Sequence, residues 1–121
     1  MTAPHLATGL LGERIAERYL ALRGWRVLAR RWRTGHRDLD LVVVRDAQIA
    51  FVEVKARRSA DFGDPAQAVH AQKRRELVRA ARAWIGSQGR AGDSYRFDVV
   101  GVVLTDGRIW VQHVENAFGV N

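Results

Sequence analysis

The 121-residue sequence predicts one α/β domain in which a mixed β-sheet is flanked by two main helices. Two segments carry apolar residues at helical spacing, and five shorter segments are rich in apolar and β-branched residues. The length suits one domain and is too short for two domains with separate cores. We therefore expect a single domain over residues 1–121, with the element order αβββαββ.

The first element is a helix over residues 10–23 that begins at Thr8 or Gly9. Its apolar side chains recur every three or four residues, and Gly24 follows at the position of a left-handed C-cap. The predicted inward stripe consists of Leu11, Ile15, Tyr19 and Leu22, with Ala16 and Leu20 beside it.

Three strands are expected next, over residues 25–32, 39–45 and 49–55. The first alternates only in part, and the other two are rich in valine and isoleucine. The turn at residues 46–48 is short enough for a hairpin, so the second and third strands should be antiparallel neighbours.

A long helix is expected from Asp64-Pro65 to Ile85, because aspartate is a good N-cap and proline is tolerated at the first helical position. Lys73 lies four residues after Val69 and four before Leu77. It should therefore lie on the inward stripe rather than on the solvent face.

The chain ends in a second predicted hairpin, formed by residues 95–104 and 108–114 around a turn at 105–107. The apolar segment 109–111 in its last strand is where we would look for a homodimer contact.

The charge indicates a polyanionic partner. The chain has 20 basic and 13 acidic residues, a net charge of +7 and a pI near 11.2, which favours nucleic acid. The absence of cysteine excludes disulfides, cysteine zinc sites and thiol nucleophiles. We see no signal peptide and no apolar run long enough to span a membrane, so we expect a cytoplasmic protein with no membrane partner.

Candidate chemistry gathers on the hairpin. Glu53 and Lys55 share one face of a strand, and Asp40 precedes Glu53 by 13 residues. A hairpin centred near residue 47 places Asp40 opposite about position 54, so the three side chains meet at one end of the sheet. Paired carboxylates suit Mg²⁺ or Mn²⁺, and a nearby lysine can orient or deprotonate water and stabilise charge on a phosphate.

Two simpler interpretations stay open at this point. Glu53 and Lys55 could form a strand-edge salt bridge that faces solvent. Asp38 shares the face of Asp40, and it could support the site or be a solvated charge.

Several spaced motifs carry a family resemblance. Residues 12–20 (GERIAERYL), 51–55 (FVEVK), 96–100 (RFDVV) and 113–118 (HVENAF) resemble the YraN-like family. That family belongs to the restriction-endonuclease-like PD-(D/E)XK superfamily and is related in fold to Holliday-junction resolvases. The sequence departs from it where Arg37 replaces the family glycine. An alignment on Gly35 would instead put Asp38 in the position of Asp40.

The resemblance implies a restriction-endonuclease-like three-layer core and a Mg²⁺- or Mn²⁺-dependent endonuclease. Asp40, Glu53 and Glu13 would be metal ligands, and Lys55 would join Asp40 and Glu53 as a catalytic residue. The alternatives are an inactive nucleic-acid-binding module and a subunit of a DNA repair or recombination complex.

The substrate would be structured or nonspecific nucleic acid, since no separate sequence-reading module is present. DNA is preferred, and RNA stays an alternative because phosphate contacts do not distinguish RNA from DNA. Basic side chains around the acidic strand would contact phosphates, which position a nucleic acid without reading its sequence. The candidates are Arg31, Arg33, Arg37, Arg57, Lys73 and Arg74.

Overall fold

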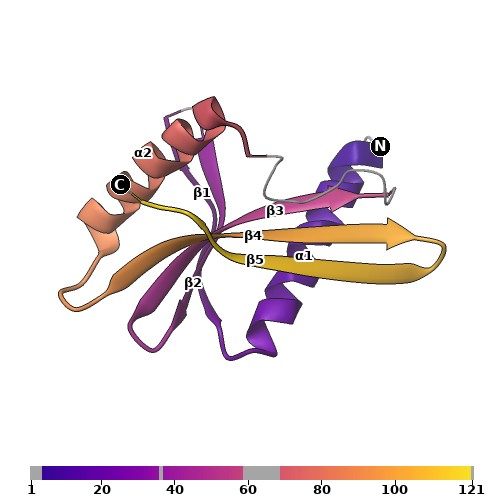
Figure 1. The fold of residues 1–121 in the computed structure, drawn as a ribbon, viewed down its shortest axis with the longest axis horizontal. Coiled ribbons are helices and arrows are strands. Elements are labelled where there is room, and N and C mark those ends of the chain that lie inside the picture. Colours follow the sequence, from indigo (N-terminus) through magenta and orange to yellow (C-terminus); the bar gives the residue numbers. More distant parts are fainter. Residues whose placement is uncertain (1–3, 36, 59–68, 121) are drawn as a thin grey trace.

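The computed structural model describes residues 4–35, 37–58 and 69–120, and it confirms the predicted element order (Figure 1). The elements are α1 (Pro4–Ala21), β1 (Arg26–Thr34), β2 (Arg37–Arg45), β3 (Gln48–Arg57), α2 (Ala71–Gln88), β4 (Ser94–Thr105) and β5 (Arg108–Phe118).

The five strands form one mixed sheet in the order β1-β2-β3-β4-β5. All neighbours are antiparallel except β3 and β4, which are parallel and are connected through α2. Both faces of the sheet carry a core, one packed against α1 and the other against α2 (Figure 1). The predicted three-layer α/β architecture is therefore confirmed.

The predicted β2–β3 hairpin is confirmed, with a tighter turn than expected. Arg45 pairs with Gln48, which leaves Asp46 and Ala47 as the turn, and Asp46 has a left-handed φ of 55°. The centre of the hairpin is thus half a residue earlier than predicted, so the register points Asp40 towards Glu53 rather than towards position 54.

Helix α1 begins and ends earlier than predicted, and its buried line differs. Leu11 and Leu22, predicted to face inward, are 43% and 73% exposed, while Ala16 and Leu20 are buried. The cause is a close approach at Gly12, where an added Cβ would lie 2.4 Å from the Cβ of Ala56 on β3. The helix therefore rests on the sheet along a line one residue away from the predicted stripe.

A helix that began at Asp64-Pro65 would include residues 69–70, and these two residues are not helical. The predicted start of α2 is therefore wrong. Asp64 and Pro65 themselves lie outside the described residues. His70 is the N-cap: its backbone is extended, and its Nδ1 accepts a hydrogen bond from the Lys73 amide at 3.3 Å. Lys73 is buried with Leu77, so the predicted inward position of Lys73 is confirmed.

The β4–β5 hairpin turns at Asp106 and Gly107, which both have positive φ. Strand β5 continues to Phe118, four residues beyond the predicted end, and leaves Ile109 and Trp110 58% and 59% exposed. Within the described chain, neither helix is long and apolar enough to cross a membrane.

Candidate active site

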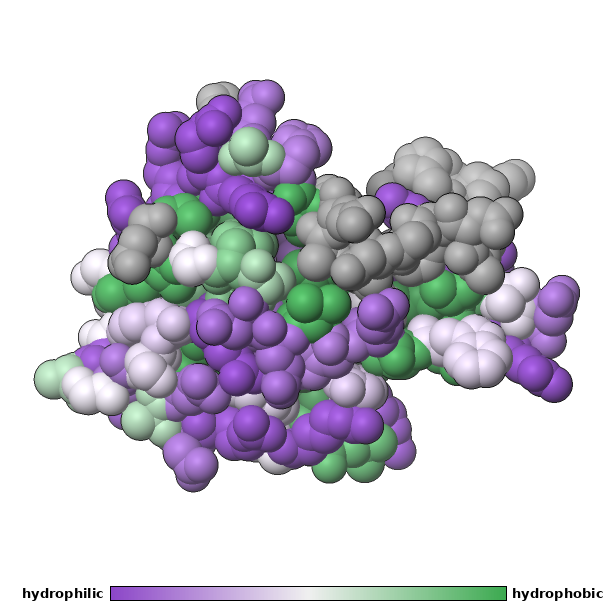
Figure 2. Space-filling model, in the orientation of Figure 1, coloured by the Kyte–Doolittle hydropathy of each residue, from purple (hydrophilic) through white to green (hydrophobic). Residues whose placement is uncertain are grey.

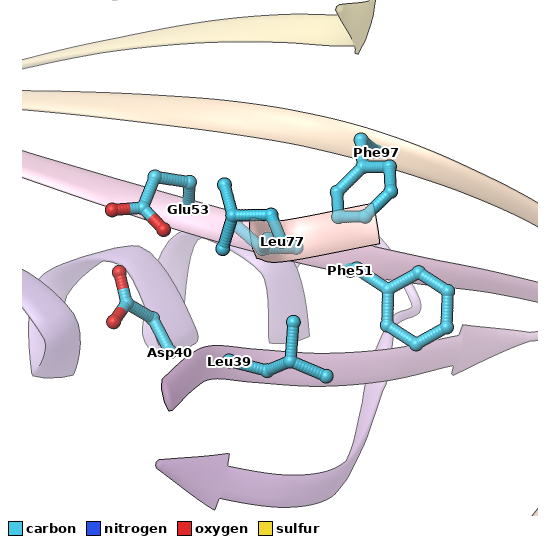
Figure 3. A pocket seen from close by; sticks show the side chains of 7 residues that line it. Leu39, Asp40, Phe51, Glu53, Leu77 and Phe97 are labelled. Atoms are coloured by element: carbon cyan, nitrogen blue, oxygen red, sulfur yellow. The ribbon is translucent and has the colours of Figure 1, made fainter. Parts of the chain in front are cut away.

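The site begins where β2 and β3 separate. Their backbone pairing ends at Leu41 and Val52. Beyond it the carboxylate of Asp40 joins the two strands, because its Oδ2 accepts a hydrogen bond from the Val54 amide at 2.8 Å. Glu53 is 7% exposed and turns its carboxylate towards that of Asp40 (Figure 3). Asp40, Glu53, Leu39, Phe51, Leu77 and Phe97 line one small pocket (Figure 3).

Helix α2 supplies the cation that meets Glu53. The Nζ of Lys73 lies 2.7 Å from Oε1 of Glu53, and both side chains are almost completely buried. Burying a charge costs several kcal/mol unless a partner compensates, so this ion pair depends on α2 being docked on the sheet. The sequence placed Lys73 inward but did not identify Glu53 as its partner.

Lys55 completes the basic side of the site. Burial, followed by the hydrogen bond with Lys73 and the charge of that lysine, lowers its pKa to about 8, and Glu53 opposes this shift. Glu53 is buried and its ion-pair partner is Lys73, so the solvent-facing Glu53–Lys55 pair considered above is wrong.

Asp40 is the least compensated carboxylate of the site. Burial raises its pKa to about 7, together with the negative charge of Glu53 and, to a smaller extent, that of Glu13. The Val54 amide and Lys73 oppose this rise without cancelling it. Within the described chain, Glu53 therefore has Lys73 as its cation, whereas Asp40 has no ion-pair partner.

Asp38 does not take the place of Asp40. Its carboxylate is half exposed and lies 3.4 Å from the guanidinium of Arg33. Of the two aspartates, Asp40 lines the pocket together with Glu53, and Asp38 does not.

Glu13 reaches the edge of the site from α1. Both of its oxygens bind the guanidinium of Arg31, at 2.9 and 3.0 Å. Arg31 has a left-handed φ of 49°, uncommon for a non-glycine residue within a strand, and its charge is also stabilised by Asp40 and Asp38. No three His, Cys, Asp or Glu side chains within residues 4–35, 37–58 and 69–120 gather as metal ligands. The structure thus brings together two of the three predicted ligands.

The donor chemistry nevertheless fits a hard divalent cation. Two carboxylates converge in a largely buried position, one of them with a strongly raised pKa, and carboxylate oxygens are the ligands that Mg²⁺ and Mn²⁺ prefer. Asp40 and Glu53 could hold such an ion, with Lys73 moving from Glu53 or sharing its carboxylate.

Most of the predicted phosphate-binding arginines have other partners. Arg31 pairs with Glu13, Arg33 with Asp38, and Arg37 with Glu76. Arg57 donates to the carbonyl of Ala56.

Arg74, also predicted to contact phosphate, donates to the carbonyl of Val69. Lys73 lies inside the site, on Glu53, and not on the outer surface.

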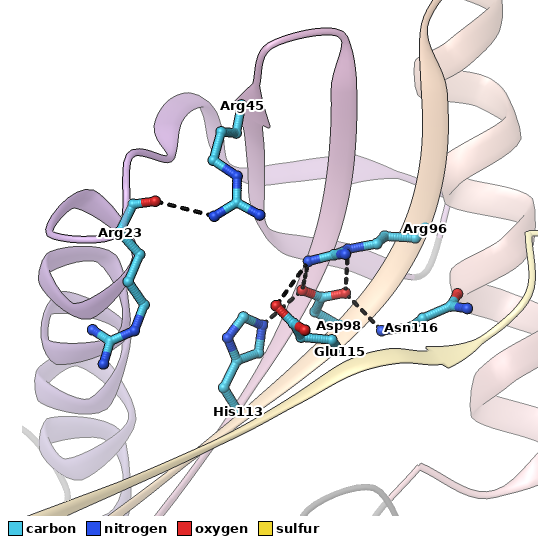
Figure 4. Close-up of polar contacts among 7 residues, drawn as sticks. All are labelled: Arg23, Arg45, Arg96, Asp98, His113, Glu115 and Asn116. Carbon is cyan, nitrogen blue, oxygen red and sulfur yellow. Dashed lines mark hydrogen bonds and ion pairs between the residues drawn. The ribbon is translucent and has the colours of Figure 1, made fainter.

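Sequence reasoning missed a second polar cluster around Asp98, which is 0% exposed (Figure 4). Asp98 accepts hydrogen bonds from the Asn116 amide at 3.0 Å and from Arg96 at 3.1 Å, and it lies 2.7 Å from Nε2 of His113. The available signal in the sequence was Asp98 itself, an aspartate with apolar residues directly before and after it in the strand.

The fold and the site define a small three-layer α/β protein with a buried carboxylate pair and two lysines where two central strands part. The model of "Uncharacterised protein family UPF0102" matches residues 12–102. The UPF0102 protein of Syntrophomonas wolfei is 42% identical over 110 residues, covering 91% of this chain and 96% of the relative. That of Nocardia farcinica is 44% identical over 114 residues, covering 93% and 89%. The chain belongs to the UPF0102 family, which confirms the YraN-like resemblance.

Proposed function

We propose that this protein is a metal-dependent phosphodiester hydrolase that acts on nucleic acid, DNA in preference to RNA. The observation that carries the proposal is the meeting of Asp40 and Glu53 beside Lys55 and Lys73. Of the two carboxylates, only Glu53 has an ion-pair partner within the described chain. A chain with a net charge of +7 that keeps such a pair together is suited to a divalent cation and a phosphate.

Asp40 and Glu53 would hold the Mg²⁺ or Mn²⁺. When bound, the ion supplies Lewis-acid stabilisation of the phosphate and lowers the pKa of water. The Val54 amide fixes one oxygen of Asp40, so the other remains available to a ligand.

Lys55 has the proton-transfer role. With a pKa of about 8 it is mostly protonated at pH 7, when it can stabilise negative charge on a phosphate. A substantial fraction is neutral at pH 8, and that fraction can accept a proton from an attacking water. Lys73, which pairs with Glu53, would orient that carboxylate.

The test is a cleavage assay on supercoiled, linear and branched DNA and on RNA, with Mg²⁺ or Mn²⁺. Wild type should cleave, Glu53→Gln and Asp40→Asn should fall to background, and Lys55→Met should lose about a hundredfold. Asp38→Asn is the matched control, because this half-exposed carboxylate of β2 lies outside the pocket and should keep wild-type cleavage. Absence of metal-dependent cleavage by wild type on every substrate would refute the proposal.

One observation favours a second function, a nucleic-acid-binding module without turnover. Lys73 already neutralises Glu53, and Arg37 stands where the resembling family has glycine. Isothermal calorimetry separates the two functions: a hydrolase binds Mn²⁺ and loses that binding in Glu53→Gln. A binding module shows no metal binding while its affinity for DNA still depends on salt.

A further inference from the structure

Two sets of arginines in this protein differ in their partners. Four arginines of β1 and the start of β2 make ion pairs: Arg30 with Glu17, and Arg31, Arg33 and Arg37 with the carboxylates named for the site. Over the described part of the chain, Arg75, Arg79 and Arg82 of α2 are exposed and form no ion pair with a carboxylate. The positive charge of the long helix that no carboxylate pairs is therefore on these three side chains and on Arg74, which donates to the carbonyl of Val69.

These three arginines form a stripe. At about 100° and 1.5 Å per residue, they lie within roughly 60° of one another around the helix and span about 10 Å along it. One strand of a DNA duplex presents a phosphate about every 3.4 Å of helix axis, so the stripe is long enough to reach about three phosphates. In the space-filling view, hydrophilic side chains gather over the upper part of α2, with apolar side chains between them (Figure 2).

A groove runs beside the stripe. Its volume is about 530 Å³, and it is lined by the three arginines, Arg74, Val78, Phe118 and Gly119. The ring of Phe118 stacks on buried Phe97 with 4.4 Å between ring centroids, and the guanidinium of Arg74 lies 5.5 Å from the centroid of Phe118. The floor of the groove is thus fixed to the core, while its wall is a row of mobile cations.

We propose that this stripe, Arg75, Arg79 and Arg82, with the groove beside it, binds the phosphate backbone of a nucleic acid. The inference rests on the substrate class of the proposed function and extends it. The stripe points roughly 180–240° around α2 from Lys73, away from Glu53. The backbone segment on the stripe is therefore a flanking segment and not the one presented to Asp40 and Glu53.

A regularly charged backbone fits this surface better than a membrane does. The stripe is a line of guanidinium groups beside a groove with one aromatic and one valine side chain, and guanidinium forks match phosphate oxygens. A membrane-binding helix would present a broad apolar face of leucine, phenylalanine or tryptophan, which this face of α2 lacks.

The experiment measures the affinity of the full-length protein for a fluorescent 30-base-pair DNA duplex and for the matching RNA duplex, in EDTA, across a salt series. The test variant is Arg75→Gln/Arg79→Gln/Arg82→Gln. The control, Arg14→Gln/Arg18→Gln/Arg108→Gln, removes the same charge from exposed arginines elsewhere. Each phosphate contact contributes about 0.9 to the slope of log K against log salt. The test variant should bind about tenfold or more weakly, with a slope lower by about three, whereas the control should keep the wild-type slope.

The outcomes separate this inference from the proposed function. If the test variant and the control bind equally, the stripe is not the binding surface, although wild-type cleavage can still stand. If the test variant loses binding but wild type cleaves nothing, the stripe stands and the hydrolase proposal fails. If wild type binds vesicles of phosphatidylserine and phosphatidylcholine but no nucleic acid, both are wrong. Arg79→Gln alone, expected to lower the slope by about one, replaces the triple variant if that variant does not fold.

Discussion

Two aspartates of this protein, Asp98 fully buried and Asp40 partly buried, have opposite surroundings. Burial alone would raise the pKa of Asp98, but its hydrogen bonds with His113 and the Asn116 amide and the charge of Arg96 hold that pKa below the usual range. Burial raises the pKa of Asp40 to about 7, and its nearest charged neighbour is another carboxylate. Asp98 is satisfied by the protein alone, whereas in the described chain Asp40 has no ion-pair partner and Lys73 pairs with Glu53. The first arrangement stabilises a fold, and the second costs stability and is typical of a functional site.

The comparison predicts that removing the charge of Asp98 destabilises the protein most. Asp98→Asn should lower the free energy of unfolding by about 4 kcal/mol, because it leaves Arg96 and His113 buried without their anion. Urea unfolding followed by circular dichroism measures the change. Glu115→Gln, which removes the exposed partner of Arg96, is the control and should change it by less than about 0.5 kcal/mol. Similar losses in both variants would contradict the assignment of Asp98 as the centre of the cluster.

In the region of Asp40 and Glu53, the loss of the Lys73 cation should destabilise the protein. Lys73→Met should lower the free energy of unfolding by about 2 kcal/mol, because Glu53 is left buried without its partner, although Lys55 remains nearby. Adding Glu53→Gln should recover most of the loss. A double-mutant cycle measures this coupling, and additive effects of the two changes would show that the pair contributes nothing specific.

Asp40→Asn should raise the free energy of unfolding, whereas the changes at Asp98 and Lys73 lower it. It removes the repulsion with Glu53 while the side-chain oxygen can still accept from Val54, so stability at pH 8 should rise by about 1 kcal/mol. In the wild type the folded state keeps a proton on Asp40 that the unfolded state has lost. Its contribution to stability therefore falls as the pH rises from about 4 to about 7.

The pH profile of unfolding separates the two aspartates. The fall in the free energy of unfolding between pH 4 and 7 that Asp40 causes should disappear in Asp40→Asn and persist in Asp38→Asn. Asp98, whose pKa is lowered, contributes stability above its unfolded value that is lost as the pH falls through its folded value. An unchanged profile in Asp40→Asn would contradict the raised pKa.

The last expected effect is stabilisation by metal. Mg²⁺ at about ten times its Kd should stabilise the wild type by about 1.4 kcal/mol at pH 8, a shift of a few degrees in Tm. Asp40→Asn should show less than half of that shift, and Asp98→Asn should keep it in full. Differential scanning calorimetry with and without Mg²⁺ measures the shifts, and an equal response of wild type and Asp40→Asn would place the ion elsewhere.

The sequence predicted the elements whose signals are local. Alternation, turn residues and the distance from Asp40 to Glu53 predicted the hairpin and the meeting of these carboxylates, with an error of one residue. Helical spacing predicted that Lys73 points inward. These succeed because the period of a strand or helix fixes which side chains share a face.

The features that the sequence could not predict depend on contacts between distant segments. The line of burial on α1 is set by Gly12 meeting Ala56, and the neutralisation of Arg37 by Glu76 joins β2 to α2. Such partners are 39 or more residues apart and leave no periodic trace. For the same reason the sequence could not show which arginines form ion pairs with distant carboxylates.

The parallel pairing of β3 and β4 also has a consequence for the order of folding. Antiparallel strands can close through a two-residue turn, but this pair forms only after the chain has crossed over through α2. Glu53 lies on one strand of that pair and Lys73 on the crossover, so the ion pair between them belongs to slow, long-range assembly. A nascent or partly unfolded chain can hold the β2–β3 hairpin and its two carboxylates, but it gains the lysine only when the whole topology has closed.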